Sequence, residues 1–483
     1  MAFSSVQFLF VFLPLSLAVY WLCPKWLRNA VLAAFSLLFF AWAGLKGAAI
    51  LVLLAGINWL GGLSLGRLAH KRPLLILLIL LDLAVLGGFK YAGFAAETVN
   101  ALVPGLLPVL SPALPLGLSF YVFTAIGYCA DVAAGKVESE KNPIRFAVFL
   151  AFFGHGPSGP IVRYGQQAPQ LDPCGQARCV SADRFCYGIK RLVLGLAKKA
   201  IIADQLALIY AKVASVPAAT LPAPILVLGY TAYMMQLYFD FSGYSDMAIG
   251  IGEFFGITLP ENFEYPYLAC SVGEYWRRWH ISLSSWFRDY VYIPLGGSRH
   301  GVPVLILATM VTFLVSGAWH GAALGFVVWG GLHGAYLLAG RATRPLREKA
   351  WALLRQKPGS PVRSAVGWAA TLVLVCFAWI FFFSGDVGQV RLLMSYLARP
   401  IPFSVQYLKE SFTQLGYTTA VLFRLGLFAL AAFGVDFAAR KDGFGRWAAA
   451  RRGWVQVLFC YGCVFATLFW GAAGTLQNIY FQF

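Results

Sequence analysis

The sequence contains few charged residues. Only 12% of its 483 residues are Asp, Glu, Lys or Arg, whereas soluble domains average about 25%. Hydrophobic residues make up 59% of the chain, and its mean hydropathy is +0.70. So small a share of polar side chains leaves too little to cover a surface in water. This excludes an ordinary soluble protein and indicates that lipid surrounds most of the chain.

Acidic residues are scarcer than basic ones, with 20 Asp and Glu against 38 Lys and Arg, which gives a net charge of +18. In a soluble protein this excess would suggest nucleic-acid binding. Here the basic residues cluster in short loops between apolar runs, a pattern typical of cytoplasmic loops facing anionic lipid. We therefore expect a membrane partner and no nucleic acid.

Patterns for metals, disulfides and a cleaved leader are also missing. The nine cysteines are scattered, and Cys174 and Cys179 lack the second ligand pair of a zinc site. We expect no metal and no permanently bound cofactor. The first 22 residues have no basic region and no small-residue cleavage site before Pro24, which predicts a retained first transmembrane helix.

Apolar runs dominate what is present. Crossing about 30 Å of hydrocarbon takes about 20 apolar residues, or fewer where the span is thin or buried. The sequence therefore predicts an all-α polytopic membrane protein with about 11–12 transmembrane helices in one domain, residues 1–483. Its expected parts are N-terminal helices (1–157), core segments (158–340) and C-terminal helices (341–483). The candidate spans lie near residues 6–22, 29–44, 46–66, 74–89, 116–134, 145–157, 222–239, 303–318, 321–340, 364–383, 419–438 and 454–474.

The basic loops predict the orientation of these spans. Loops at residues 25–28, 67–72 and 136–145 are basic, as are residues 341–363, with seven Lys or Arg against one Glu. Residues 440–452 hold five against one Asp. All of them should be cytoplasmic, and an even number of candidate spans separates each successive pair. Both termini are then expected on the extracytoplasmic side.

The middle of the chain breaks this pattern. Residues 158–215 and 256–300 contain Pro, Gly and many charges, in pieces too short or too polar to span. Irregular backbone at membrane depth is tolerated only where protein buries it or where it lines a watery cavity. The centre of the sequence is therefore where we look for chemistry.

His320 is the strongest candidate among the six histidines. The apolar arm before it, residues 303–316, measures roughly 21 Å as a helix, which leaves His320 inside the hydrocarbon zone. An ionisable group held there is a functional hypothesis by default, and a core histidine bonded to a carbonyl is the alternative. Gly317 and Gly321 beside it permit close helix approach or room for a ligand. His333 would point about 220° away from His320 on a shared helix, which favours packing or a supporting role.

A second histidine, His280, lies in a Trp- and Arg-rich segment, residues 274–290. Its apolar residues recur at helical spacing, which predicts an amphipathic helix in the membrane interface. His280 could still reach inward as a partner for His320. Three arginines of this segment could hold the phosphates of an acyl donor, although lipid anchoring explains them equally well: Arg277, Arg278 and Arg288.

Residues 238–246 place two carboxylates, Asp240 and Asp246, between apolar runs. A carboxylate at the centre of a membrane helix costs roughly 2.5–3.5 kcal/mol. Each therefore needs a cationic partner or a water-filled cavity. A structural pairing and a functional site are both open at this point.

Several ordered motifs together resemble the membrane-bound O-acyltransferase (MBOAT) superfamily, in particular its bacterial alginate O-acetyltransferase-like branch. The stretch Gly154-His155-Gly156 departs from the Phe-Phe-Pro pattern expected there. The motifs are Phe-Leu-Phe-Val-Phe-Leu-Pro (8–14), Pro-Leu-Gly-Leu-Ser-Phe (115–120), Ser-Gly-Pro-Ile-Val-Arg (158–163), Asp-Phe-Ser-Gly-Tyr-Ser-Asp (240–246), Pro-Glu-Asn-Phe (260–263), Trp-Arg-Arg-Trp-His-Ile-Ser-Leu (276–283), Tyr-Ile-Pro-Leu-Gly-Gly (292–297), Trp-His-Gly-Ala (319–322) and Ile-Tyr-Phe-Gln-Phe (479–483).

The resemblance implies a ring of tilted helices around a thin, re-entrant centre with a tunnel through the membrane. It assigns the family's signature histidine to His320 and its second histidine to His280. Acetyl would pass from a cytoplasmic donor, acetyl-CoA, across the bacterial inner membrane, and an extracytoplasmic SGNH or esterase-like acetyltransferase would complete its delivery to a polysaccharide. The residues we expect to support the site or line the tunnel are Asp240, Tyr244, Asp246, Trp279 and Trp319.

These observations lead to a mechanistic hypothesis. A hydroxyl is a poor nucleophile at neutral pH, and a histidine is a natural general base for activating it. His320 would take the proton of the acceptor hydroxyl, and His280 would orient or polarise the reacting groups. No Ser or Cys stands beside a base in the sequence, which favours direct transfer. A transporter or scramblase of an acyl carrier is the alternative, as is a scaffold that recruits a separate enzyme. The glycan that receives the acetyl group stays open.

Overall fold

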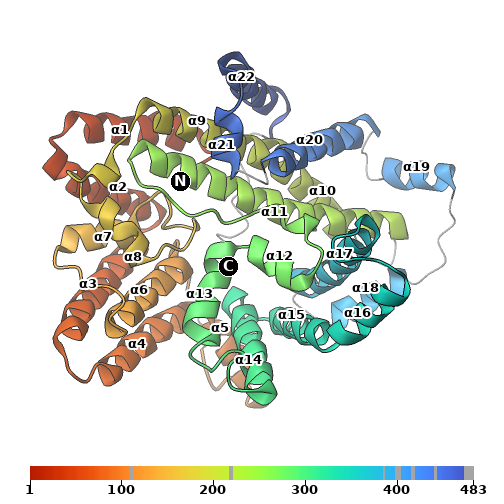
Figure 1. Ribbon diagram of the computed structural model, residues 1–483, viewed down its shortest axis with the longest axis horizontal. Coiled ribbons are helices and arrows are strands. Elements are labelled where there is room, and N and C mark those ends of the chain that lie inside the picture. Colours follow the sequence, from red (N-terminus) through yellow and green to blue (C-terminus); the bar gives the residue numbers. More distant parts are fainter. Residues whose placement is uncertain are drawn as a thin grey trace. The chain divides into compact units, whose positions relative to one another are not determined.

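The computed structural model describes residues 1–108, 112–216, 221–384, 387–397, 404–414, 419–439 and 443–472. These residues form helices, turns and irregular segments, and none of them lies in a strand (Figure 1). They divide into two compact units. The first comprises Met1–Leu192 and Tyr244–Glu261, and the second comprises Val193–Gly243 and Asn262–Ile479, as far as described. The all-α fold class is confirmed.

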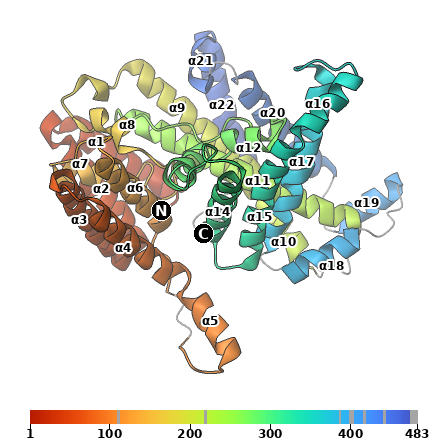
Figure 2. The same ribbon diagram turned by 60° about the horizontal axis from the view of Figure 1, so that its bottom comes forward.

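The first unit holds the N-terminal helices. In Figure 2, α5 continues from α4 away from the other helices of this unit. Helices α9 (Ala182–Ala197) and α11 (Ala223–Phe254) each belong partly to this unit and partly to the second. The other elements are η1 (Phe8–Phe12), α1 (Leu13–Leu22), η2 (Lys25–Leu27), α2 (Arg28–Ala43), α3 (Leu45–Arg67), α4 (Arg72–Lys90), α5 (Ala92–Leu102), α6 (Leu118–Ala133), α7 (Pro143–Ala151), α8 (Tyr164–Gln167), η3 (Ala168–Leu171) and η4 (Gln176–Arg178).

The second unit holds the remaining elements. Several of its helices are short, particularly between residues 262 and 301. They are η5 (Lys198–Ala203), α10 (Asp204–Ala214), η7 (Pro266–Leu268), α12 (Val272–Arg278), α13 (Ile281–Phe287), η8 (Arg288–Tyr292), α14 (Val302–His320), α15 (Leu324–Ala342), α16 (Arg344–Leu353), α17 (Pro361–Ser384), α18 (Val387–Leu397), α19 (Val405–Gln414), α20 (Thr419–Ala438), α21 (Gly443–Ala449) and α22 (Gly453–Trp470).

Among the described residues, seven helices are long and apolar enough to cross a membrane. Two shorter apolar helices, Phe8–Leu22 and Leu118–Ala133, accompany them. The chain is therefore a multi-pass membrane protein, and the candidate spans predicted at these places are confirmed as helices. The seven are Lys25–Ala43, Leu45–Arg67, Arg72–Lys90, Val302–His320, Pro361–Ser384, Ala420–Ala438 and Gly453–Trp470.

The span predicted at residues 145–157 is wrong. Helix α7 ends at Ala151, and turns follow it as far as Gly159. The Tyr164 hydroxyl then donates to the Glu140 carboxylate at 2.7 Å, so the chain returns to the loop from which α7 began. Phe152 and Phe153 are fully buried in the unit. The run is apolar because protein, rather than lipid, surrounds it.

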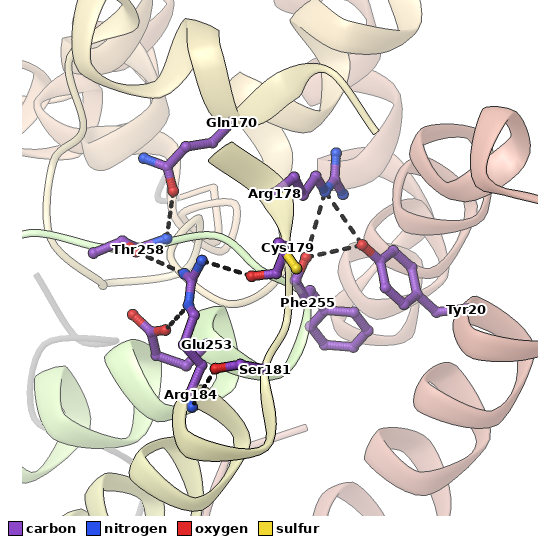
Figure 3. Close-up of polar contacts among 9 residues, drawn as sticks. All are labelled: Tyr20, Gln170, Arg178, Cys179, Ser181, Arg184, Glu253, Phe255 and Thr258. Carbon is purple, nitrogen blue, oxygen red and sulfur yellow. Dashed lines mark hydrogen bonds and ion pairs between the residues drawn. The ribbon is translucent and has the colours of Figure 1, made fainter. Parts of the chain in front are cut away.

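The connector from α7 to α9 is fixed to the end of α11 by polar contacts within the first unit (Figure 3). The Arg184 guanidinium donates to the Glu253 carboxylate at 2.6 Å and to the Thr258 hydroxyl at 2.7 Å. Arg178 donates to the Tyr20 hydroxyl at 3.2 Å, and that hydroxyl donates to the Phe255 carbonyl at 2.8 Å. Tyr20, Glu253 and Phe255 are buried, whereas Thr258 is exposed. The irregular segment is thus held in place mainly by buried partners, as non-helical backbone near lipid requires.

Helix α9 continues into η5, a π-helical stretch, and then into α10 without a break. In the first unit, Arg191 of α9 pairs with Asp246 of α11 at 2.5 Å. In the second, Lys199 of η5 pairs with Asp240 of α11 at 2.7 Å and with Asp204 at 2.7 Å. Both buried carboxylates therefore have cationic partners, as their burial requires.

Candidate active site

His320 is the last residue of α14, which forms a tight hairpin with α15. The backbone is extended at Gly321, and α15 starts at Leu324. A Cβ atom on Gly317 would lie 2.3 Å from the Phe326 carbonyl oxygen, and one on Gly330 would lie 2.2 Å from the Phe313 carbonyl oxygen. The two backbones are therefore in direct contact, so the predicted close helix approach beside His320 is confirmed.

Aromatic rings enclose the His320 imidazole, which is only 3% exposed. The centre of its ring lies 4.8 Å from Trp319, 4.9 Å from Phe382 of α17 and 5.2 Å from Trp329 of α15. Three helices of the second unit therefore contribute to this enclosure. Such surroundings exclude bulk water and strengthen any hydrogen bond that the imidazole makes.

His280 occupies a break between two short helices. The predicted continuous helix over residues 274–290 is wrong, because α12 ends at Arg278 and α13 starts at Ile281. His280 has φ of 44°, the left-handed region that costs a non-glycine residue of order 1–3 kcal/mol. Apolar spacing continues through the break, so the sequence pattern could not reveal it.

Asn262 holds this break in place. Its side-chain oxygen accepts from the Ser282 backbone N–H at 3.1 Å and from the Ser282 hydroxyl at 2.9 Å. His280 Nδ1 lies 3.2 Å from the same oxygen. Because this oxygen is an acceptor, Nδ1 carries the proton and Nε2 carries the lone pair. Burial lowers the pKa of the His280 imidazole to about 3, so the ring is neutral at physiological pH.

Trp319 lies against both histidines. Its ring centre is 4.8 Å from that of His320 and 6.5 Å from that of His280. Phe241 of α11 also packs on His280, at 4.6 Å, and Trp279 packs on Trp379 at 5.3 Å. The structure thus gathers into the second unit both predicted catalytic histidines and two of the predicted supporting residues, Trp279 and Trp319.

The remaining predicted supporting residues are divided between the units. Asp240 precedes Phe241 in the second unit and binds Lys199. Tyr244 and Asp246 belong to the first unit. There Tyr244 stacks on Phe3 at 4.6 Å, and Asp246 pairs with Arg191.

His333 faces the same aromatic cluster as His320. The 220° separation assumed one helix, but the break at Gly321 puts the two residues on neighbouring helices. Both imidazoles pack on Trp329, with ring centres at 5.2 Å for His320 and 5.1 Å for His333. His333 Nδ1 accepts from Trp276 Nε1 at 3.2 Å. A contact through one shared ring therefore links the two histidines.

A cavity of about 420 Å³ lies beside this cluster and is lined by residues of α12, α13, η8, α14 and α15. Two of the predicted donor-binding residues line it, Arg277 and Arg288, and so does Arg341, which sequence reasoning missed. Its apolar walls include Trp276 and Phe313. Ser316, one helical turn before His320, also lines it.

Arg278 is not among the residues that line this cavity. Its guanidinium pairs with Glu274 at 2.5 Å and lies 4.6 Å from the centre of the Tyr265 ring.

Asn262 and Trp329 were also missed by sequence reasoning. Asn262 belongs to the Pro-Glu-Asn-Phe motif, whose only signal was resemblance, and Trp329 is one of many aromatic residues in an apolar run. Within the described ranges, no group of three or more His, Cys, Asp or Glu side chains could hold a metal ion.

Comparison with known proteins gives consistent matches. Residues 136–383 match the MBOAT, membrane-bound O-acyltransferase family. The chain is 39% identical over 395 residues to a probable alginate O-acetylase AlgI of Pseudomonas syringae pv. tomato, covering 80% of this chain and 73% of that protein. It is 32% identical to a peptidoglycan O-acetyltransferase of Helicobacter pylori, covering 79% of this chain and 76% of that protein. It is 28% identical to a teichoic acid D-alanyltransferase of Bacillus subtilis, covering 51% of this chain and 66% of that protein.

Proposed function

The chain belongs to the membrane-bound O-acyltransferase family and is an O-acyltransferase, and from this we propose that it moves an acetyl group onto a hydroxyl of a cell-envelope polysaccharide. Alginate and peptidoglycan are the acceptors named for relatives of comparable length. The observation that carries the proposal is the pairing of two buried histidines around Trp319, next to a cavity with arginines on its wall.

His320 acts as the general base in this proposal. It takes the proton of the acceptor hydroxyl as the hydroxyl oxygen adds to the carbonyl carbon of the thioester. The carbon–sulfur bond then breaks, and the leaving thiolate receives that proton. The products are an O-acetyl ester and a free thiol, so no proton is gained or lost overall.

His280 orients the acceptor. Since its Nδ1–H donates to Asn262, its Nε2 can accept a hydrogen bond but cannot donate one. It therefore suits the hydroxyl of the acceptor rather than the carbonyl of the donor. Of the two roles that the sequence suggested for His280, orienting or polarising the reacting groups, this proposal keeps the first.

Acetyl-CoA is the proposed donor. Arg277, Arg288 and Arg341 would bind its phosphates, since guanidinium groups match phosphate oxygens in geometry and charge. The apolar walls of the cavity suit the pantetheine arm, and Ser316 would lie near the thioester end. Arg278, whose charge is paired with Glu274, is assigned to positioning this segment instead.

The wider setting is part of the same proposal. The protein would lie in the bacterial inner membrane, and a tunnel would connect the donor face with the acceptor face. Asp240, Tyr244 and Asp246 would maintain the helices around that tunnel. An SGNH or esterase-like acetyltransferase outside the membrane would receive the acetyl group and deliver it to the polymer.

The test is acceptor-dependent release of thiol from acetyl-CoA by the purified chain in proteoliposomes supplied with the extracytoplasmic acetyltransferase, with alginate and peptidoglycan oligosaccharides as acceptors. The expected result is O-acetyl groups on the acceptor and an equal amount of free CoA. His320→Ala should abolish both, whereas the control His300→Ala, in an exposed loop, should not. Normal transfer by a folded His320→Ala variant would contradict the base assignment. Movement of intact acetyl-CoA without thiol release would instead indicate a transporter.

A further inference from the structure

One aromatic cluster of the second unit holds three N–H groups that are buried without an acceptor among the described residues: His333 Nε2, Trp329 Nε1 and Trp379 Nε1. Their side chains are 0%, 1% and 3% exposed. Buried polar groups nearly always have a hydrogen-bond partner, so three orphan donors in one cluster require an explanation.

Trp329 is the centre of this cluster. Its ring centre lies 5.1 Å from that of His333 and 5.5 Å from that of Trp379. His320 also contacts it, at 5.2 Å and almost perpendicular, as do Trp276 and Phe382. Trp329 therefore lies directly against the proposed general base, and the rings of His333 and Trp379 lie against Trp329.

All three orphan groups of the cluster are hydrogen-bond donors. An indole nitrogen can only donate. His333 is also a donor at Nε2, because its Nδ1 accepts from Trp276 at 3.2 Å and so cannot carry the proton. The cluster thus offers donors without acceptors, and all three are neutral. Such a set suits an oxygen that accepts hydrogen bonds and gains negative charge, and it does not suit a cation or a hydroxyl that must lose its proton.

We propose that Trp329, His333 and Trp379 bind the carbonyl oxygen of the acyl group during transfer, a role that rests on the proposed function. As the acceptor oxygen forms its bond to the carbonyl carbon, the carbonyl electron pair moves onto this oxygen. The three N–H groups stabilise the resulting oxyanion. The pair returns when the carbon–sulfur bond breaks. The same walls, Trp276 and Phe313, that contact His333 face the cavity assigned to the donor.

Trp329→Phe tests this role, because it removes the N–H group and keeps an aromatic ring. We expect kcat for acetyl transfer to fall roughly 100-fold, the range found for loss of one oxyanion donor, with KM for acetyl-CoA changed less than about twofold. Since no hydrogen bond within the protein is lost, the thermal midpoint in detergent should not fall on that account. Trp379→Phe should behave in the same way.

Trp368→Phe is the matched control. Its Nε1 already donates to the Tyr267 carbonyl at 2.8 Å. This substitution should lower the thermal midpoint and leave kcat unchanged, the opposite pattern to Trp329→Phe. A second comparison uses His333: Gln carries a donor near the Nε2 position and Phe carries none. His333→Gln should therefore retain at least tenfold more activity than His333→Phe.

The inference is overturned if Trp329→Phe and His333→Phe keep kcat within twofold of the wild type, as expected if the orphan donors only bind water. It is also overturned if His333→Gln and His333→Phe lower kcat equally, since that pattern marks a packing role rather than a donor role. A wild-type protein that releases no thiol would refute the proposed function and this inference with it. Active wild-type protein with normal variants refutes this inference alone.

Discussion

Replacing Asn262 with Ala removes the acceptor that holds the break at His280. The side chain is fully buried, and its oxygen receives three hydrogen bonds, two from Ser282 and one from His280. The backbone carbonyl of Asn262 accepts from the Ile281 backbone N–H at 3.0 Å, a contact that the substitution leaves in place. The change is therefore confined to the side-chain contacts.

The expected loss of stability is about 3 kcal/mol, from three hydrogen bonds at about 1 kcal/mol each. Losing them also removes contacts that hold His280 in the left-handed conformation, which costs a non-glycine residue free energy. The imidazole should leave its place beside Trp319, and acetyl transfer should fall at least tenfold. Unfolding by SDS titration and thiol release from acetyl-CoA measure the two effects. Stability within about 1 kcal/mol of the wild type, the value of a single hydrogen bond, together with normal transfer would refute this account of the break.

Asn262→Asp sharpens the test because it keeps an acceptor oxygen and adds a charge. A carboxylate beside Nδ1 favours the imidazolium form and raises the pKa of His280 above its burial-lowered value of about 3. Below the raised pKa, Nε2 is protonated and can no longer accept from the hydroxyl. Transfer should therefore decline on the acid side at a pH where the wild type is unaffected. Identical pH profiles of kcat from pH 5 to 8 would contradict the assigned role of His280.

Three further predictions concern packing, burial and donor binding. Gly330→Ala should lower both the thermal midpoint and the rate of acetyl transfer, because its Cβ would meet the Phe313 carbonyl. Gly331→Ala makes only ordinary contacts and should be neutral. Equal effects of the two substitutions would refute the close packing of α14 and α15. Lys199→Met leaves Asp204 and Asp240 without their shared cation and should lower the free energy of unfolding, measured by SDS titration, by about 3–5 kcal/mol. A decrease below about 1 kcal/mol would contradict this prediction. Arg277→Ala should raise KM for acetyl-CoA about tenfold or more, unlike Arg278→Ala, and unchanged KM would remove Arg277 from the donor site.

The lipid-facing helices could be predicted from sequence because a single property defines them. Hydrocarbon requires a continuous apolar run, and the span predicted at 419–438 coincides with α20. The same rule failed at 145–157, where apolar side chains face other protein segments. Hydropathy does not distinguish lipid from a protein interior, so a buried re-entrant segment and a crossing helix give the same signal.

The arrangement around the histidines depends on contacts that no local pattern contains. The break at His280 is fixed by Asn262, 18 residues earlier in the chain. The placement of His333 beside His320 depends on a turn at Gly321 that local hydrophobicity does not reveal. The sequence predicted catalytic roles for His320 and His280, and it predicted the cation that Asp240 binds. It could not indicate that His320 and His333 both pack on the ring of Trp329.

The π-helical winding of η5 sets which residues can meet across one turn. Lys199 binds Asp204, five positions later. In an α-helix, residues five apart point about 140° away from each other, but the wider π turn brings position i+5 back beneath position i. Deleting one residue from 198–203 would restore α-helical winding and separate this ion pair. We therefore expect that α9, η5 and α10, residues 182–214, do not tolerate insertions or deletions, whereas the loops of the protein do.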